Sequence, residues 1–453
     1  WNCNPRRPDT SIQSSSPLVR RLGVVDLTLI TVGAVIGSGI FRTPAIVAQR
    51  VHQPGLIVAC WIAGGALALI GAFVFAELAA RRPLDGGLYA YLRDAYHPAV
   101  GFVFAWSVFW IAYTGGTAAS AVLFATYLGP ALGIPMDPRW IAVAAMACVT
   151  AVNVLGVRQG ATWQNLLVIL KLGAVAALIV AAFVAHPIAH AASPHVQLAP
   201  IALLGALGVA MLPVLFAYNG FQTATYISVE TRQPERTMPR GIVLGVTCVV
   251  VVYVLVSTGC LRVLGVDGLA SSSTPAADVM HAAMGVFGSR AIAIAIAIST
   301  LGYMSSGILL GPRLYYQVAR DGLAPRAIAW VAPRTRVPVV AILMHGGMSA
   351  AIAASGTYEQ IVNWVTAPDW AFVMLAAAAI FVFRKRDAGV PRPPISVPGH
   401  PWTTAALIVV LLGIFVSEIA VYPHDTLYGG IVLLSGAVFY GLWRGWSNRR
   451  ERA

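Results

Sequence analysis

The sequence predicts an all-α integral membrane protein with twelve transmembrane helices, and two observations support this prediction. The chain has 453 residues, of which 58% are hydrophobic and only 10% are charged, whereas soluble globular proteins are about 25% charged. The apolar residues fall in repeated runs of about 20, the helix length that crosses about 30 Å of hydrocarbon. A soluble enzyme is therefore excluded.

The apolar runs follow one another with short polar connections. We expect spans at residues 24–48, 56–80, 99–127, 139–156, 163–185, 201–229, 241–264, 289–316, 338–355, 358–384, 402–422 and 426–446. Residues 1–23 are polar and rich in Arg and Ser, without the apolar core of a cleavable signal peptide. This segment and residues 447–453 are expected to be cytoplasmic tails.

The distribution of basic residues predicts how the chain is oriented. If the N-terminus is cytoplasmic, the inner segments and inner span ends hold 24 of the 30 Lys and Arg residues, and the outer side holds four. Because cytoplasmic loops concentrate Lys and Arg, both termini are expected on the cytoplasmic side of a cell membrane, inner or plasma. The formal net charge of +13 then reflects orientation, and we expect contacts with membrane lipid but no nucleic acid partner.

The sequence contains no signature of catalysis or of metal binding. Its five cysteines lie far apart, without a CxxC pair or a His/Cys ligand spacing. HExxH and GxSxG motifs are absent as well. We therefore expect no enzyme activity, no catalytic residue, no cofactor and no metal site. A channel would be expected to show rings of pore charge or a filter motif, which this sequence lacks.

The first span contains a cluster of glycines at its centre. Gly33, Gly37 and Gly39 lie close together, with Ser38 between the last two. Gly33 and Gly37 alone are also compatible with a small-xxx-small face for helix packing. Consecutive small residues are poor helix formers, however, and Gly37-Ser38-Gly39 covers most of a turn. We therefore expect a break in this helix.

The sixth span repeats the feature. Pro213 lies inside it and Asn219-Gly220 falls near its centre, and these residues favour non-helical backbone. Because span 6 lies an odd number of spans after span 1, two five-helix halves would cross the bilayer in opposite directions. Paired broken helices in inverted repeats are typical of transporters whose substrate site lies at the two breaks.

The helix ends at these breaks suit a zwitterion. Free N–H groups at a helix start bind anions, so we expect a carboxylate on the amides of Ser38, Gly39 and Ile40. An α-ammonium group would meet free carbonyl oxygens at the ends of the inner helix halves. The carbonyls we assign to it belong to Val35, Phe216, Ala217 and Asn219. Gly37 and Phe221 complete the two breaks and are counted among the expected substrate-binding residues.

Three segments around these breaks resemble one family. GAVIGSGIF in span 1, LFAYNGFQTATYISVETRQPERTMPR in span 6 and GPRLYYQVARDGLAP after span 8 resemble amino acid–polyamine–organocation (APC) permeases. They are most similar to the L-type amino acid transporter branch and its bacterial homologues. The resemblance implies a LeuT-like fold with a first five-helix repeat over residues 24–185, an inverted second repeat over 201–384 and peripheral helices over 402–446. It also implies alternating access to amino acids, with backbone substrate contacts at Val35, Ser38, Gly39, Phe216, Ala217 and Asn219.

Two departures from the L-type pattern limit what the resemblance implies. Segment 128–138, between spans 3 and 4, contains no cysteine. The attachment point for a disulfide-linked heavy subunit is therefore missing, and no such partner is expected. Asn219 stands where much of the branch has glycine, which leaves the selectivity for substrate side chains open.

Lys171 is expected to serve coupling or gating. It lies eight residues into span 5, too deep for its ammonium group to reach the interface easily. One interpretation is a structural lysine bound to carbonyls. The resemblance implies another, in which the lysine replaces the sodium ion of sodium-coupled relatives and links span 5 to span 1 and to the hydroxyls of Ser305 and Ser306 in span 8.

Five acidic residues lie in or at the predicted spans and require an explanation, because charges within a bilayer are costly. They are Asp26, Glu77, Glu230, Asp369 and Glu418. The resemblance places Asp369 and Trp370, in span 10, near the side-chain end of the substrate pocket. A capped helix start after Pro368 explains Asp369 equally well. Glu77 lies at the cytoplasmic end of span 2, where we expect it to pair with a loop arginine such as Arg81.

The predicted function is secondary active transport of neutral L-amino acids, which are the expected small-molecule partner, by sodium-independent exchange or facilitated flux. A proton-coupled symporter of amino acids or polyamines with the same fold is the alternative.

Overall fold

The computed structural model describes residues 22–82, 87–156, 161–188, 200–335, 337–389, 391 and 393–452. Helices account for nearly all of these residues, and this described part contains no strand, only an isolated bridge between Leu22 and Thr231. The α-helices of the first half are α1 (Val24–Val35), α2 (Gly39–Val51), α3 (Pro54–Arg81), α4 (Leu88–Ala95), α5 (Pro98–Ser107), α6 (Tyr113–Leu132), α7 (Pro138–Val154) and α8 (Ala161–Val184). Those of the second half are α9 (Pro200–Tyr218), α10 (Pro234–Ser271), α11 (Pro275–Arg320), α12 (Val339–Ser355), α13 (Tyr358–Arg386), α14 (Trp402–Val421) and α15 (Pro423–Arg452). Three further segments are the π-helix η2 (Val108–Ala112) and the 3₁₀-helices η3 (Phe221–Glu230) and η4 (Arg326–Ala329).

These helices coincide with the predicted membrane spans. Nine helices of the described residues are long and apolar enough to cross a membrane, and α1 and α2, bent by 46° at their junction, form a tenth candidate. The shorter apolar helices α7 and α12, of 17 residues each, lie where spans 4 and 9 are predicted. The all-α membrane architecture is therefore confirmed, with a helix at each predicted span.

Two helices exceed their predicted spans because each includes a kink. α10 bends at Gly265, just past the predicted end of span 7, and α11 bends at Gly285, just before the predicted start of span 8. The apolar runs thus match the straight parts of these helices. The residues between the two kinks form a helical connection between the two spans.

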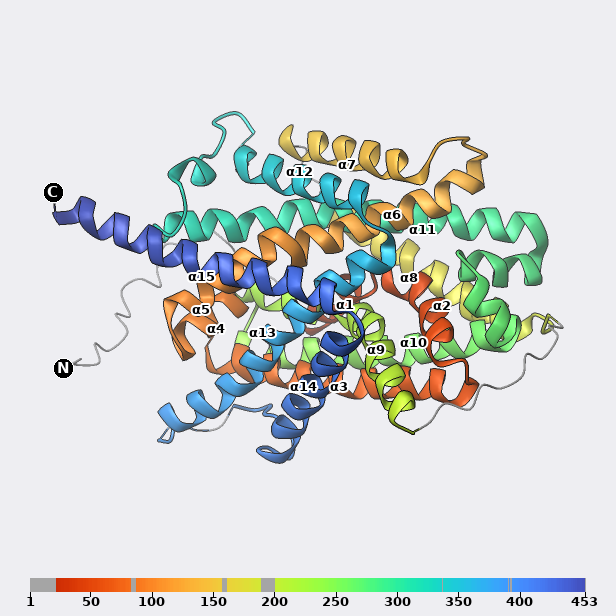
Figure 1. Ribbon diagram of the computed structural model, residues 1–453, viewed down its shortest axis with the longest axis horizontal. Coiled ribbons are helices and arrows are strands. Elements are labelled where there is room, and N and C mark those ends of the chain that lie inside the picture. The colour runs from red at the N-terminus through yellow and green to blue at the C-terminus, as the bar shows by residue number, and fades with distance from the viewer. Residues whose placement is uncertain are drawn as a thin grey trace.

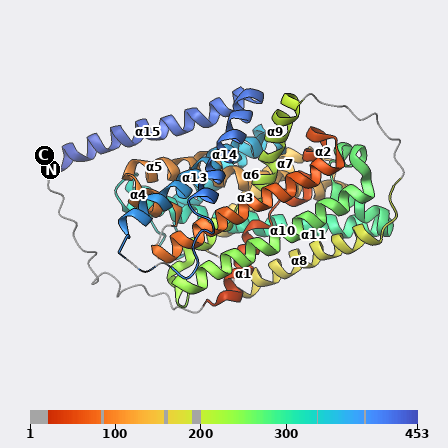
Figure 2. The ribbon, with the colours of Figure 1, turned by 90° about the horizontal axis from the view of Figure 1, so that it is seen from below.

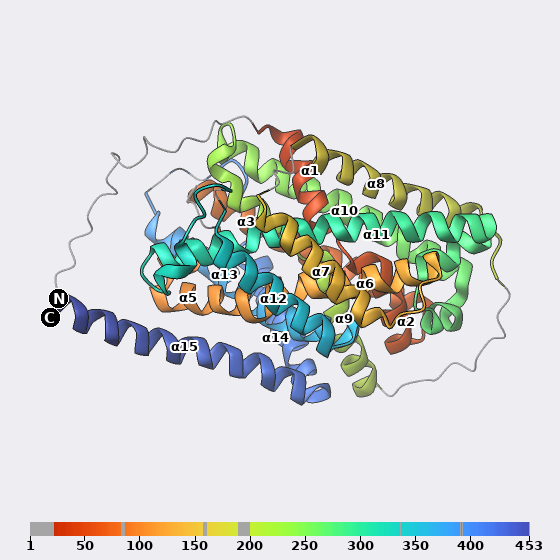
Figure 3. The same ribbon diagram turned by 90° about the horizontal axis from the view of Figure 1, so that it is seen from above.

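The helix connections segregate to two ends of the molecule (Figure 1). α4, the connection between α11 and α12 and the C-terminal end of α15 lie at the left of Figure 1, whereas the α6–α7 and α10–α11 connections lie at the right. Figures 2 and 3 place α8 and α15 at opposite edges of the bundle. The three segments at the left, all predicted to be cytoplasmic, therefore share one end, as a multi-pass topology requires.

A buried aromatic cluster holds the interrupted helices in position. Trp61 of α3, Tyr218 of α9 and Tyr253 of α10 pack with ring centroids 5.1 to 5.8 Å apart. The Tyr218 hydroxyl donates to the carbonyl oxygen of Trp61 at 3.0 Å. Aromatic packing together with satisfied hydroxyls makes such clusters rigid, so the end of α9 is fixed against α3 and α10.

Candidate functional site

The first span is broken where the sequence predicts it. α1 ends at Val35, the backbone of Ile36 leaves the helical region with ψ at 83°, and α2 begins at Gly39. The Gly37 N–H donates to the carbonyl oxygen of Val35 at 2.7 Å, which closes a tight turn inside the span. The start of α2, with Ser38 and Ile40 buried, is therefore an internal helix N-terminus.

The sixth span is broken at Asn219-Gly220, also as predicted. α9 runs through Pro213 and ends at Tyr218, and the 3₁₀-helix η3 follows from Phe221. Gly220 has φ +116°, a conformation that favours glycine. Its N–H donates to the side-chain oxygen of Asn219 at 2.8 Å. Of the two local signals in the sequence, Asn219-Gly220 marks the break, and Pro213 is accommodated inside the helix.

The two breaks contact each other directly. A Cβ placed on Gly39 would lie 2.7 Å from the Cα of Ala217, and one placed on Gly220 would lie 2.6 Å from the carbonyl oxygen of Ala34. Both distances are shorter than any side chain permits, so each position requires glycine. The N-terminal end of α2 thus packs on the end of α9, and the end of α1 packs on the turn that follows α9.

The backbone groups at the two breaks are the expected ligands of a zwitterion. The first N–H groups of any helix have no acceptor within that helix, and in α2 these belong to Gly39 and Ile40. Two of the expected carbonyls have donors within the protein: Val35 accepts from Gly37 N–H and from the Tyr253 hydroxyl at 3.0 Å, and Phe216 accepts from Asn219 N–H at 3.2 Å.

Tyr253 was not predicted as part of this site. In the sequence it lies within VVVVYVLV, a run that looks uniformly lipid-facing. In the structure its side chain is fully buried and its hydroxyl reaches the last residue of α1. A polar atom in an otherwise apolar run is the only signal that could have identified it.

The aromatic residues of the sixth span have different surroundings. The Phe216 ring meets Tyr358 of α13 edge-on, with centroids 6.3 Å apart. The Phe221 ring is fully buried between Phe75 of α3 and Trp370 of α13, at 5.7 and 6.3 Å. Phe221 therefore anchors η3 to its neighbours.

Lys171 is buried and links two spans. Its Nζ atom donates to the carbonyl oxygen of Gly33 in α1 at 3.1 Å, so α8 is tied to α1, the N-terminal part of the first span. Ser305 accepts from the side-chain amide of Asn153 in α7 at 3.3 Å, and Ser306 donates to the carbonyl of Gly302 in its own helix at 3.0 Å. The contact between Lys171 and span 1 matches both interpretations of this lysine.

Asp369 lies in the middle of α13, whose N-cap is Thr357. A capped helix start after Pro368 is therefore wrong, because the helix begins eleven residues earlier and includes the proline. The carboxylate is buried and its Oδ2 atom accepts from the side-chain amide of Asn219 and from that of Gln222, the latter at 3.5 Å. Asp369 is thus brought to the break of the sixth span.

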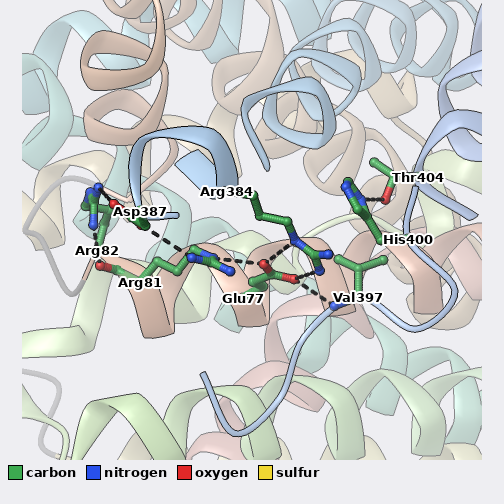
Figure 4. A network of polar contacts seen from close by, with 8 residues as sticks. All are labelled: Glu77, Arg81, Arg82, Arg384, Asp387, Val397, His400 and Thr404. Atoms are coloured by element: carbon green, nitrogen blue, oxygen red, sulfur yellow. Dashed lines mark hydrogen bonds and ion pairs between the residues drawn. The ribbon is translucent and has the colours of Figure 1, made fainter. Parts of the chain in front are cut away.

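A second polar cluster lies at the end of the molecule predicted to be cytoplasmic (Figure 4). Arg384 of α13 donates to both carboxylate oxygens of Glu77 at 2.9 and 2.7 Å, and Arg81 donates at 2.8 Å. The Val397 N–H adds a contact at 2.8 Å, and Arg81 also pairs with Asp387 at 3.3 Å. The predicted pairing of Glu77 with Arg81 is confirmed, and the cluster joins α3, α13 and the segment before α14.

No group of three or more His, Cys, Asp or Glu side chains in the described ranges is arranged to hold a metal ion.

Comparison with known proteins identifies the family. The sequence model of the amino acid permease family matches residues 22–433. The human b(0,+)-type amino acid transporter 1 is 28% identical, over 97% of this chain and 91% of its own length. The human cystine/glutamate transporter is 25% identical, over 96% and 88%, and the mouse Asc-type amino acid transporter 1 is 27% identical, over 95% and 82%.

These relatives confirm the resemblance to the APC superfamily, and the two interrupted spans agree with the LeuT-like fold that it implies. The match extends over nearly the whole length of the chain, from the first helix into the last. The chain is a multi-pass membrane protein that belongs to the amino acid permease family.

Proposed function

We propose that the protein carries neutral L-amino acids across the membrane by alternating access, through sodium-independent exchange or facilitated flux. The observation that carries this proposal is the direct contact of the two breaks, at Gly39 with Ala217 and at Gly220 with Ala34. Such a pair of helix ends offers amides to a carboxylate and carbonyls to an ammonium group within one site. A zwitterion can therefore be bound without a charged side chain at either end.

In this proposal the carboxylate binds the amides of Ser38, Gly39 and Ile40. The ammonium group binds the carbonyls of Phe216, Ala217 and Asn219 together with Val35, whose oxygen it would share with Tyr253. Gly37 supplies the turn between the two sets. The names of the relatives, which cite b(0,+)-type, Asc-type and cystine/glutamate transport, support an amino acid substrate and differ on its side chain.

Sodium independence follows from Lys171. Its ammonium group occupies a position between α8 and α1 and donates to Gly33 at 3.1 Å, so a fixed cation already holds these two helices together. We propose that Ser305 and Ser306 on α11 face this cation at some stage of the cycle. A bound sodium ion is then not required.

The proposal includes the topology. We propose that residues 24–185 and 201–384 form two inverted repeats, with 402–446 peripheral and both termini cytoplasmic. The segregation of helix connections in Figure 1 supports two distinct membrane faces. Because segment 128–138 has no cysteine, we propose that the protein works without a disulfide-linked subunit.

Counterflow in proteoliposomes tests this function. Purified protein would be given labelled L-alanine, L-leucine or L-serine outside, with and without the unlabelled amino acid inside and with sodium replaced by choline. We expect uptake that depends on internal substrate and is unchanged by sodium removal. Agmatine and cadaverine, which lack the carboxylate, are expected not to compete. Strong competition by these amines, with none by the amino acids, would overturn the proposal and favour an amine carrier.

The alternative is proton-coupled symport by the same fold. The observation that favours it is the buried carboxylate of Asp369 beside the sixth-span break.

A further inference from the structure

Tyr358 is a buried tyrosine at the start of α13 whose hydroxyl group makes no hydrogen bond within the described part of the chain. The residue is only 7% exposed. A buried hydroxyl group without a partner costs free energy, so its presence requires an explanation. The hydroxyl group of Tyr358 is therefore available to a bound molecule.

This hydroxyl group lies at the break of the first span. Its polar neighbours include the hydroxyls of Ser38, the N-cap residue of α2, and of Thr43, about one turn further along α2. The Thr43 hydroxyl itself donates to the carbonyl oxygen of Pro213 in α9 at 3.4 Å. The ring of Tyr358 packs edge-on against Phe216, near the end of α9. Tyr358 thus reaches from α13 to the place where α2 begins and α9 ends.

Two contacts fix the start of α13, and with it the position of the Tyr358 side chain. Thr357 caps the helix, and its capping box is completed by Gln360. Glu359, the residue after Tyr358, pairs with Arg50 of α2 at 2.5 Å. The ion pair joins α13 to the same helix whose start Tyr358 faces. A donor that is held in place in advance binds an acceptor without the cost of ordering its side chain.

The surroundings of this hydroxyl group favour an anion over a cation. The first amides of α2, at Gly39 and Ile40, carry the positive end of the helix dipole. Arg42, on the same helix, adds a positive charge near Tyr358, and its guanidinium group donates to the carbonyl oxygen of Ser272. An ammonium group would be repelled at this place. A negatively charged acceptor would gain from the amides and from the O–H group of tyrosine together.

We propose that the hydroxyl group of Tyr358 donates to the carboxylate of the bound amino acid, beside the amides at the start of α2. This inference rests on the proposed function and adds a side-chain ligand from a third span to a site otherwise built from backbone groups. A hydrogen bond to a carboxylate is charge-assisted and stronger than one between neutral groups. Because all amino acid substrates share the carboxylate, Tyr358 contributes to the affinity for each of them equally.

Tyr358→Phe removes the hydroxyl group alone and tests this role in the full-length protein. We expect the half-saturating concentrations of L-alanine, L-leucine and L-serine in counterflow to rise by at least about tenfold, and by a similar factor for each. Without substrate, the melting temperature in detergent should not fall, since no hydrogen bond within the described ranges is lost. At a fixed substrate concentration, the increase in melting temperature should be smaller than in the wild type, because weaker binding stabilises less.

Tyr127→Phe is the matched control at a second buried tyrosine that contacts α2. The Tyr127 hydroxyl donates to the carbonyl oxygen of Phe41 at 2.9 Å, so this variant loses a hydrogen bond that the protein already makes. We expect a lower melting temperature and unchanged half-saturating concentrations. The two variants should therefore show opposite patterns, with affinity lost in Tyr358→Phe and stability lost in Tyr127→Phe.

Two results would overturn the inference. Unchanged affinity for all three amino acids in Tyr358→Phe would mean that the hydroxyl group does not bind substrate, and a lower melting temperature in addition would make it a structural partner of Ser38 or Thr43. A loss confined to L-serine would assign the hydroxyl group to the substrate side chain. The thermal measurement requires no transport, so it decides the question even where the variant exchanges too slowly to measure. Absence of counterflow in the wild type under all conditions would instead refute the proposed function itself.

Discussion

The Nζ atom of Lys171 lies 3.1 Å from the carbonyl oxygen of Gly33, and this contact joins α8 to α1, the N-terminal part of the interrupted first span. Gly33 itself is tightly packed, since a Cβ at this position would lie 3.0 Å from a methyl group of Val168 in α8. The two helices therefore meet through both packing and a charge-assisted hydrogen bond. If transport moves span 1 against span 5, this contact controls the movement.

Lys171→Met tests that role. The substitution keeps the apolar stem and removes the ammonium group, leaving the Gly33 carbonyl unpaired at a cost of about 1 to 3 kcal/mol. Because this cost falls on a contact between moving parts, we expect exchange to slow by about tenfold, with a normal elution profile in detergent. Lys385→Ala is the control, because it also removes one positive charge but at an exposed position. This variant should exchange normally. Sodium-dependent exchange in the wild type would contradict the fixed-cation role.

Gly39→Ala tests the contact between the breaks. Its Cβ would approach the Ala217 backbone to 2.7 Å, and backbone atoms cannot move aside as a flexible side chain can. We expect substrate affinity to fall by at least about tenfold, equivalent to about 1.4 kcal/mol. Gly173→Ala is the matched control, since that helical glycine has no atom within 4 Å of the added Cβ. Equal affinities for the two variants, measured by competition in counterflow, would mean that the substrate binds elsewhere.

Glu77→Gln addresses stability instead of transport. The Glu77 side chain is fully buried and binds two arginines, so its neutralisation leaves Arg81 with Asp387 alone and Arg384 without its carboxylate partner. Breaking one partner of a buried pair typically costs about 3 to 5 kcal/mol. The matched variant is Glu359→Gln, because Glu359 is 41% exposed in its pair with Arg50, and exposed pairs contribute about 0 to 1 kcal/mol. Thermal unfolding in detergent should separate the two variants clearly, and similar melting temperatures would exclude a stabilising role for the Glu77 cluster.

The sequence was sufficient to predict the spans and both breaks, because their signals are local. Apolar runs set the spans, and Gly37-Ser38-Gly39 and Asn219-Gly220 disfavour helix wherever they occur. Proline was less informative: Pro213 and Pro368 both lie inside helices. Neighbouring helices in a membrane protein can satisfy the backbone groups that a proline frees.

Partners from distant parts of the chain could not be predicted. Arg81 follows Glu77 by one helical turn and was identified as its partner, whereas Arg384 lies 307 residues away and only tertiary packing brings it close. Tyr253 and Gln222 were also missed, because their partners are distant in the sequence. Tyr253 lies in a run of valines and bonds to Val35, 218 residues away, and the role of Gln222 depends on Asp369, 147 residues away.

Gly220→Ala separates two physical effects at the sixth-span break. The residue has φ +116°, where an L side chain is strained, and its added Cβ would also lie 2.6 Å from the carbonyl oxygen of Ala34. Gly133→Ala is the matched control, because Gly133 has φ +65° with no atom within 4 Å of the added Cβ. Strain alone typically costs about 1 to 3 kcal/mol, so Gly133→Ala should unfold at a somewhat lower temperature and still exchange.

Gly220→Ala must in addition push the end of α1 away from the turn after α9. We therefore expect it to lose exchange even in the fraction that folds, measured as counterflow per folded protein after size-exclusion chromatography. If both variants lose stability equally and exchange at the same rate per folded molecule, the contact between the turn and α1 is not part of the transport cycle.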